Sequence, residues 1–208
     1  MIEENRFASF LFKGLLRYQR LQKSKVFGPV WQTVWDSSLR RYPGPVSIKL
    51  HGKKILANNG HSYPLYARRF SRWNNPLIQL VHETSSVLSR PIVFVDIGAG
   101  IGDTVLLIES NCASNVNKYV CIEGDAEFYC YLQANLDQPE RYVLHKAMLS
   151  SADSTMPALI RTHAGTASAQ GSNVVPAVPF DQLIASSNIY PDVIKIDVDG
   201  YDGKVWPE

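Results

Sequence analysis

The fold of this 208-residue chain is decided by the stretch Val93-Phe-Val-Asp96-Ile-Gly98-Ala-Gly100-Ile-Gly102-Asp103. Its apolar, β-branched start predicts a buried strand, and its glycines allow a tight turn that opens a helix. The third glycine comes one residue earlier than in the dinucleotide fingerprint G-x-G-x-x-G, which disfavours a nicotinamide cofactor. Asp96 also precedes the turn, and a carboxylate there would repel a pyrophosphate. The stretch therefore indicates a ligand that carries positive charge.

A second acid follows the next predicted strand. Residues 119–122 are apolar and end in Glu123, 21 residues after Gly102. An acid at this point can accept hydrogen bonds from both hydroxyls of a ribose. Taken alone, Glu123 is better explained as an ordinary carboxylate at a helix start. Beside the glycine turn the ribose role is favoured, and S-adenosylmethionine carries a ribose, an amino group and a sulfonium.

Strands and helices alternate outward from this turn. The pattern predicts a helix over 76–89, a helix over 102–110, a helix capped by Asp125 and a short helix over 179–185. Between them it predicts strands at 92–97, 119–122, 142–145 and 193–198. Such alternation is typical of an α/β fold, here a Rossmann-like three-layer sandwich with a mainly parallel sheet. Residues 150–176 are rich in Ser, Ala, Gly and Thr, which indicates a loop or a weak hairpin.

Residues 1–75 are expected to form a small α+β appendage, and residues 76–208 the main domain. The appendage combines a helix within the first 25 residues with a hairpin over 46–56. Charge divides in the same direction: residues 1–90 hold 15 Lys and Arg against four acids, while the rest of the chain is acidic. The basic part could serve a peripheral membrane or protein contact through the N-terminal helix; packing of the two parts against each other explains the charge split at least as well. A nucleic-acid partner is disfavoured, because no stacking aromatics interleave with the cations.

The composition excludes several classes of protein. With 45% hydrophobic and 19% charged residues, the chain can bury a core and is not intrinsically disordered. Its apolar runs are too short for a membrane-spanning helix. Three cysteines without a C-x-x-C pair argue against a disulfide framework and a zinc cluster. We therefore expect a cytoplasmic protein without a metal site.

Six stretches combine into a recognisable pattern. They are Phe94–Gly102, Cys121–Phe128, His145–Leu149, Gly165–Ser168, Val178–Leu183 and, most distinctive, Val193-Ile-Lys-Ile-Asp-Val-Asp-Gly200. Over residues 92–205 the chain resembles the FkbM-type class I S-adenosylmethionine-dependent methyltransferases. It departs from them at Gly124, where proline is common, and at Asp199, where glutamate is commoner. The chain also stops ten residues after the fourth strand, so it looks truncated relative to that family.

The resemblance implies that S-adenosylmethionine is bound along the ends of the first three strands. Its methionine part would lie along the glycine turn, its ribose at Glu123, and its adenine near the residues that follow the third strand. The cofactor-binding residues implied are Asp96, Gly98, Ala99, Gly100, Gly102, Glu123, Ala147 and Met148.

Lys195, Asp197 and Asp199 alternate with apolar residues at the carboxyl end of the fourth strand. Ligands of open α/β sheets bind at that edge, so these side chains are catalytic candidates. They could act as a general base, hold a divalent cation, or form a structural network. We favour the first and expect Asp197 on the acceptor side. The expected function is methyl transfer to a hydroxyl of a small molecule or glycan; the alternative is a catalytically inactive binding or interaction module.

Overall fold

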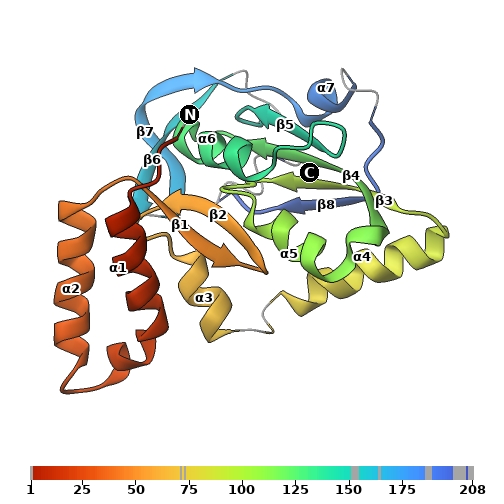
Figure 1. Cartoon of the computed structure of the whole chain (residues 1–208). Helices are drawn as coiled ribbons and strands as arrows, with labels where there is room; N and C mark the ends of the chain where they lie inside the picture. Colours follow the sequence, from red (N-terminus) through yellow and green to blue (C-terminus); the bar gives the residue numbers. More distant parts are fainter. Residues whose placement is uncertain are drawn as a thin grey trace. The chain divides into compact units, whose positions relative to one another are not determined.

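A computed structural model describes residues 2–70, 72, 74–150, 155–163, 165–185, 189–198 and 205 of the chain. The chain divides into two compact units, each with its own elements (Figure 1). Unit 1 consists of Met1–Trp73 with His163–Gly165, and unit 2 of Asn74–Thr162 with Thr166–Glu208. Among the described residues, no helix combines the length and the apolar character needed to cross a membrane.

Unit 1 opens with two helices that run side by side (Figure 1). One helix was expected within the first 25 residues, but α1 (Arg6–Arg17) gives way to the 3₁₀ helix η1 (Gln19–Lys23), and α2 (Gly28–Arg41) then follows. Trp31 stacks on Trp35, and its indole N–H donates to the Leu15 carbonyl at 3.2 Å. Sequence reasoning missed α2 because its inward face carries few apolar residues beyond the two tryptophans.

A hairpin completes the core of unit 1. Strands β1 (Pro45–Leu50) and β2 (Lys53–Asn58) are antiparallel, with Leu50 opposite Lys53. The two connecting residues, His51 and Gly52, both have positive φ, as a tight hairpin turn requires. The predicted hairpin is thereby confirmed. A further short helix, α3 (Tyr63–Arg69), was not expected from the sequence.

Unit 2 is built on a four-stranded parallel sheet, which confirms the predicted α/β class. The strand order is β5-β4-β3-β8. The strands are β3 (Ile92–Ile97), β4 (Val116–Glu123), β5 (Tyr142–Lys146) and β8 (Val193–Ile196). The sequence of residues 150–176 indicates a loop or a weak hairpin. Most of this segment forms two long strands that pair with each other, β6 (Thr155–His163) and β7 (Thr166–Pro176).

Helices cover the sheet on both faces. Val95, Ile97 and Ile122 pack against Phe180 and Ile184 of α7 (Phe180–Ala185). Because side chains alternate along a strand, the neighbouring positions face the other layer. That layer contains α4 (Asn75–Leu88), α5 (Asp103–Cys112), which is followed by the 3₁₀ turn η2 (Ala113–Asn115), and α6 (Ala126–Asn135).

An ion pair ties together the starts of two neighbouring strands. The Arg90 guanidinium donates to both Asp192 oxygens, at 2.9 and 2.7 Å. Asp192 also accepts a hydrogen bond from the Val93 backbone N–H at 2.8 Å. The amino ends of β3 and β8 are therefore fastened side by side, and their carboxyl ends meet at the opposite edge of the sheet.

Candidate functional site

The sheet has a topological switch point between β3 and β8. From β3 the chain moves outward to β4 and β5, and it later returns to add β8 on the other side of β3. In open α/β sheets, ligands bind at the carboxyl ends of the strands where the order reverses. Here that edge carries the glycine loop 98–102 and residues 197–198.

The glycine loop is held down by its own backbone. The N–H groups of Gly98 and Ala99 both donate to the Ile122 carbonyl, at 2.9 and 3.1 Å. Gly102 donates to the Ala99 carbonyl at 2.9 Å, and Gly100 donates to the Glu123 carboxylate at 2.8 Å. Four donors of the loop are thus already used inside the protein.

The three glycines of the loop serve different purposes, although all have positive φ. A Cβ on Gly98 would overlap the Asp197 carbonyl oxygen, so Gly98 lets the loops after β3 and β8 touch. A Cβ on Gly102 would press on Leu132 and a second leucine of the α6 end, so this glycine lets α5 and α6 approach. Gly100 differs, because the nearest described atom to its Cβ would be Asp103 Oδ1, at an ordinary contact distance of 3.7 Å. Among the described residues, the loop is therefore least crowded at Gly100.

Glu123 lies directly beside Gly100. One of its oxygens accepts from Gly100 N–H, and the other accepts from Asp125 N–H at 2.7 Å. The side chain is buried, which raises the pKa of Glu123 to about 7; the two backbone donors oppose that rise, and the Asp125 and Asp96 carboxylates reinforce it. The end of β4 thus presents a fixed carboxyl group to the switch point.

Asp96 and Lys195 form a buried ion pair across the switch point. They are opposite each other on β3 and β8, and Nζ lies 2.9 Å from Asp96 Oδ1. Asp96 is fully buried, and among the described residues its Oδ2 has no hydrogen-bond partner. Burial alone would lower the pKa of Lys195, but the Asp96 carboxylate outweighs burial and raises it. Lys195 therefore stays an ammonium group and cannot serve as a base.

Two further carboxylates surround this pair. Asp197 is 71% exposed, with Oδ2 at 3.7 Å from Lys195 Nζ. Removal from water raises the pKa of Asp103, at the start of α5, to about 7. Asp199, the third catalytic candidate, lies outside the described residues. Within the residues that the structure describes, no three His, Cys, Asp or Glu side chains gather as metal ligands would.

The adenine-side candidates lie at the end of β5. Ala147 N–H donates to the Glu123 carbonyl at 3.1 Å, so the chain after β5 runs beside the end of β4. A Cβ on Gly124 would overlap the sulfur of Met148. Gly124 therefore makes room for Met148. The structure thus brings the candidates after β3, β4 and β5 to one edge.

Arg161 supports this edge and was missed in the sequence. It lies on β6, and its guanidinium donates to Asp125 at 3.0 and 3.1 Å and also pairs with Glu127. Asp125 in turn caps α6 and donates its N–H to Glu123. No sequence pattern signals an arginine 36 residues away, because only the folding of β6 brings it near.

No family model matches the sequence, and no curated protein matches it. Among solved structures, the chain is similar to the crystal structure of the methyltransferase FkbM from Methylobacillus flagellatus KT, with a TM-score of 0.40 and 17% sequence identity. The likeness covers 55% of this chain and 28% of that one. The matched part thus spans little more than a quarter of the other protein's length.

Proposed function

We propose that this chain binds S-adenosylmethionine at the switch point and transfers its methyl group to a hydroxyl oxygen of a small molecule or glycan. The observation that carries the proposal is the Glu123 carboxyl group, fixed by two backbone donors beside Gly100, the least crowded glycine of the loop. A carboxylate has about four lone-pair positions. Two remain here, and they match the two hydroxyls of a ribose.

The other groups of this edge suit the rest of the ligand. Asp96 Oδ2 is a buried acceptor that receives no hydrogen bond from the described part of the chain, and an ammonium group of the ligand would satisfy it. Ala99 and the two flanking glycines would border the methionine part, and Ala147 and Met148 the adenine. The bound sulfonium supplies an electrophilic methyl group.

The same loop is poorly suited to a dinucleotide. A pyrophosphate needs backbone N–H groups aimed at it. The N–H groups of Gly98, Ala99 and Gly100 are directed to protein acceptors instead. Glu123 would also repel a phosphate at the place where the loop is least crowded. This arrangement favours a cationic ligand over a nicotinamide cofactor.

Asp197 is the group that we assign to the acceptor. It is exposed just after β8, with its Oδ2 at 3.7 Å from the Lys195 ammonium. In this role an Asp197 oxygen accepts the hydrogen bond of the acceptor hydroxyl, orients its oxygen toward the methyl group, and takes up its proton as the oxygen–carbon bond forms and the methyl–sulfur bond breaks, with S-adenosylhomocysteine as the leaving group. Lys195 holds its own proton throughout.

Calorimetry with S-adenosylhomocysteine tests the binding site. Glu123→Ala removes a charge-assisted pair of hydrogen bonds, so affinity should fall about tenfold to hundredfold. Glu140→Ala is the matched control, because it removes an exposed carboxylate just before β5, at the edge of the sheet opposite the switch point, and should leave affinity unchanged. No binding by the wild type would favour the alternative, a catalytically inactive binding or interaction module. Tighter binding of NAD would favour a dehydrogenase.

Methyl transfer from labelled S-adenosylmethionine to a panel of hydroxyl-bearing small molecules and glycans tests Asp197. Asp197→Asn should leave S-adenosylhomocysteine affinity nearly intact and lower turnover by roughly 10²–10⁴. Full turnover by this variant would remove the catalytic assignment. A large loss of affinity would instead place Asp197 on the cofactor side.

A further inference from the structure

Unit 1 carries a large excess of positive charge. Residues 1–73 contain 14 Lys and Arg but three acids, Glu3, Glu4 and Asp36. Glu4 is engaged by Ser47 and Lys54, which together lower its pKa to about 2, and Asp36 accepts from Gln32. Two of the three acids are thus occupied by neighbours. The cations of this unit therefore far outnumber the acids that could pair with them inside it.

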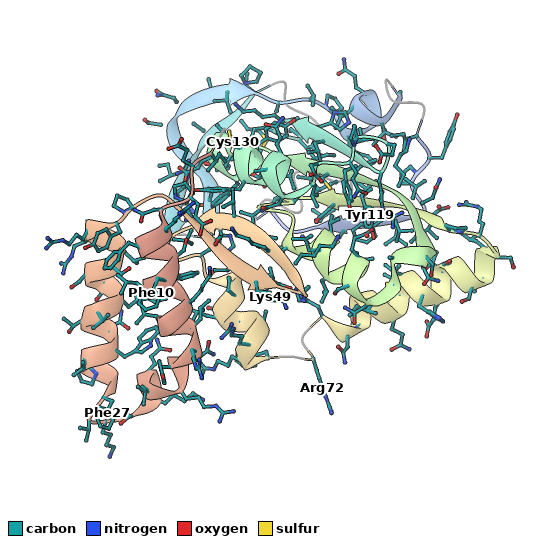
Figure 2. The ribbon with its side chains drawn as sticks, viewed as in Figure 1. Phe10, Phe27, Lys49, Arg72, Tyr119 and Cys130 are labelled. Atoms are coloured by element: carbon teal, nitrogen blue, oxygen red, sulfur yellow. The ribbon has the colours of Figure 1, made fainter. Side chains whose placement is uncertain are left out.

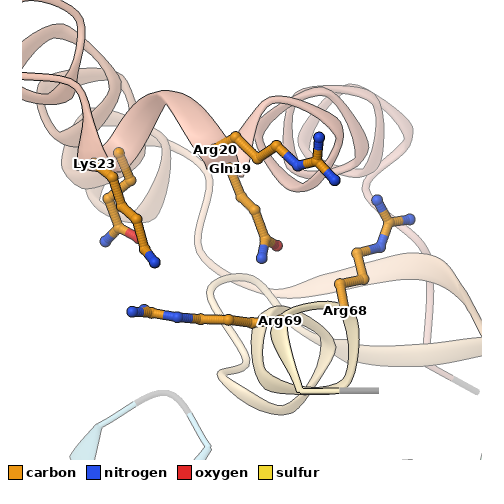
Figure 3. Close-up of a pocket in the computed structure, with 6 residues that line it drawn as sticks. Gln19, Arg20, Lys23, Arg68 and Arg69 are labelled. Atoms are coloured by element: carbon orange, nitrogen blue, oxygen red, sulfur yellow. The ribbon is translucent and has the colours of Figure 1, made fainter. Parts of the chain in front are cut away.

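Four of these cations face one hollow (Figure 3). The hollow measures about 460 Å³ and lies between η1 and α3. The Gln19 side-chain amide donates to the Leu65 carbonyl at 3.4 Å and so connects the two walls. The described residues of its lining include no carboxylate; they are Gln19, Arg20, Gln22, Lys23, Arg68 and Arg69. Cations that converge without acids repel one another and attract anions.

Apolar side chains stand exposed beside the hollow. The Ser24 hydroxyl accepts from the N–H groups of Val26 and Phe27, at 3.3 and 3.2 Å, and so shapes the turn after η1. Val26 is 73% exposed and Phe27 56% exposed, and Leu21 is exposed too. Phe27 lies at the end of the α1–α2 pair where η1 connects the two helices (Figure 2). We call the hollow and these three apolar residues the basic tip.

We propose that the basic tip docks on an anionic lipid bilayer, with lipid phosphates in the hollow and with Val26 and Phe27 entering the interface. Membrane-surface binding combines attraction of cations to anionic headgroups with burial of apolar side chains. A soluble polyanion or a nucleic acid would use the cations but gains little from aliphatic Leu21 and Val26. The combination therefore favours a membrane over those partners.

The surface differs from the N-terminal helix expected from the sequence. The apolar face of α1, including Phe12, Leu15 and Leu16, is buried within unit 1. That face cannot also insert into a bilayer. The basic tip is instead assembled from η1, from the turn between η1 and α2, and from α3. Docking is independent of the proposed transfer chemistry, since none of its residues belongs to the switch point.

Sedimentation of the full chain with lipid vesicles tests the docking. Binding should be strong to vesicles of phosphatidylcholine with phosphatidylglycerol, weak to phosphatidylcholine alone, and weakened by salt. Arg68→Ala/Arg69→Ala should lower partitioning about tenfold, because each cation near the surface adds attraction. Lys49→Ala/Lys53→Ala removes the same charge from exposed positions on the β-hairpin formed by β1 and β2. This variant should change partitioning less than threefold.

A second variant tests the contribution of the apolar side chains of the basic tip. Val26→Ser/Phe27→Ser should also lower partitioning to the anionic vesicles about tenfold. Val87→Ser/Val174→Ser, at exposed positions of unit 2, is the matched control and should have no effect. Unfolding midpoints of all variants should equal that of the wild type. The proposal is wrong if the anionic vesicles do not bind, or if heparin binds with the same dependence on Arg68 and Arg69 while the apolar variant changes nothing.

Discussion

The switch point of unit 2 and the basic tip of unit 1 both gather charged side chains, but they treat charge in opposite ways. At the switch point, Asp96 and Lys195 are paired in a buried place, and strand register fixes them opposite each other. At the basic tip, Arg68 and Arg69 are exposed and converge on a hollow whose described lining holds no acid. The first arrangement sets the position of groups for chemistry. The second leaves charge available for a partner, so its removal should cost the fold little.

The largest expected effect comes from breaking the buried pair. Lys195→Met leaves Asp96 unpaired in the core and should lower the free energy of unfolding by about 3–5 kcal/mol at pH 7. Arg68→Ala should change it by less than about 0.5 kcal/mol. Urea unfolding measures both. The double variant Asp96→Asn/Lys195→Met should recover most of the loss, and failure to recover would show that Lys195 acts through packing rather than charge.

The glycine loop gives the next largest effect. Gly98→Ala combines a left-handed backbone, which costs about 1–2 kcal/mol, with overlap on the Asp197 carbonyl, which adds about 1–3 kcal/mol. Gly100→Ala meets only an ordinary contact with Asp103 among the described residues and should cost only the backbone part. Gly100→Ala should nonetheless weaken S-adenosylhomocysteine binding, since its methyl group would enter the ligand space. Equal destabilisation by the two variants would contradict the different purposes of these glycines.

The two units should also respond to pH in opposite directions. Glu123 has its pKa raised from 4.5 to about 7, so the folded state binds more protons than the unfolded state between these values. Its contribution is largest below pH 4.5 and is lost as pH rises to 7, by about 3 kcal/mol if fully expressed. Asp103 adds to this trend. Glu4 has a lowered pKa, so its contribution is present above pH 4.5 and is lost as pH falls toward 2.

Thermal unfolding as a function of pH checks this contrast. Glu123→Gln should flatten the decline between pH 4.5 and 7 while leaving the loss below pH 4.5 unchanged. Glu4→Gln should do the reverse. A wild-type protein whose stability rises steadily from pH 5 to 7 would contradict the burial of Glu123 as described.

The smallest expected effect concerns Arg161, which is exposed like the arginines of the basic tip but paired with acids like Lys195 at the switch point. Arg161 is 39% exposed but pairs with Asp125 behind Glu123. Arg161→Ala should lower the free energy of unfolding by about 0.5–1 kcal/mol, as exposed ion pairs do. It should weaken S-adenosylhomocysteine binding less than Glu123→Ala does, because it acts only through the position of Asp125. An effect as large as that of Glu123→Ala would make Arg161 a direct ligand contact.

Sequence predicted the switch point better than it predicted the basic tip. The acids at 96 and 123 each stand at the end of an apolar run, and in a parallel sheet such ends share one edge. Their approximate place therefore follows from local pattern alone. For Lys195 the sequence allows a catalytic role or a place in a structural network of charges. The structure adds that Lys195 pairs with Asp96, which favours its protonated form.

The basic tip could not be predicted in the same way. Arg20 and Arg68 are 48 positions apart, and a helix not seen in the sequence carries the second. Nothing periodic connects them, because the hollow exists only once η1 and α3 face each other. For residues 150–176 the sequence indicates a loop or a weak hairpin, and the pairing of β6 with β7 bears out the hairpin. The length of these strands is not predicted, since Ser, Ala and Gly weaken the alternation that marks a strand.

The ion pair between Arg90 and Asp192 has a consequence for the order of folding. It joins residues 102 positions apart, whereas β3 and β4 are separated by fewer than 20 residues. Closing a longer loop costs more chain entropy, so the nearer strands pair first. We expect β8 to dock last, when the Arg90–Asp192 pair forms. A newly made chain would then assemble the Glu123 side of the switch point before Asp197 reaches the same edge.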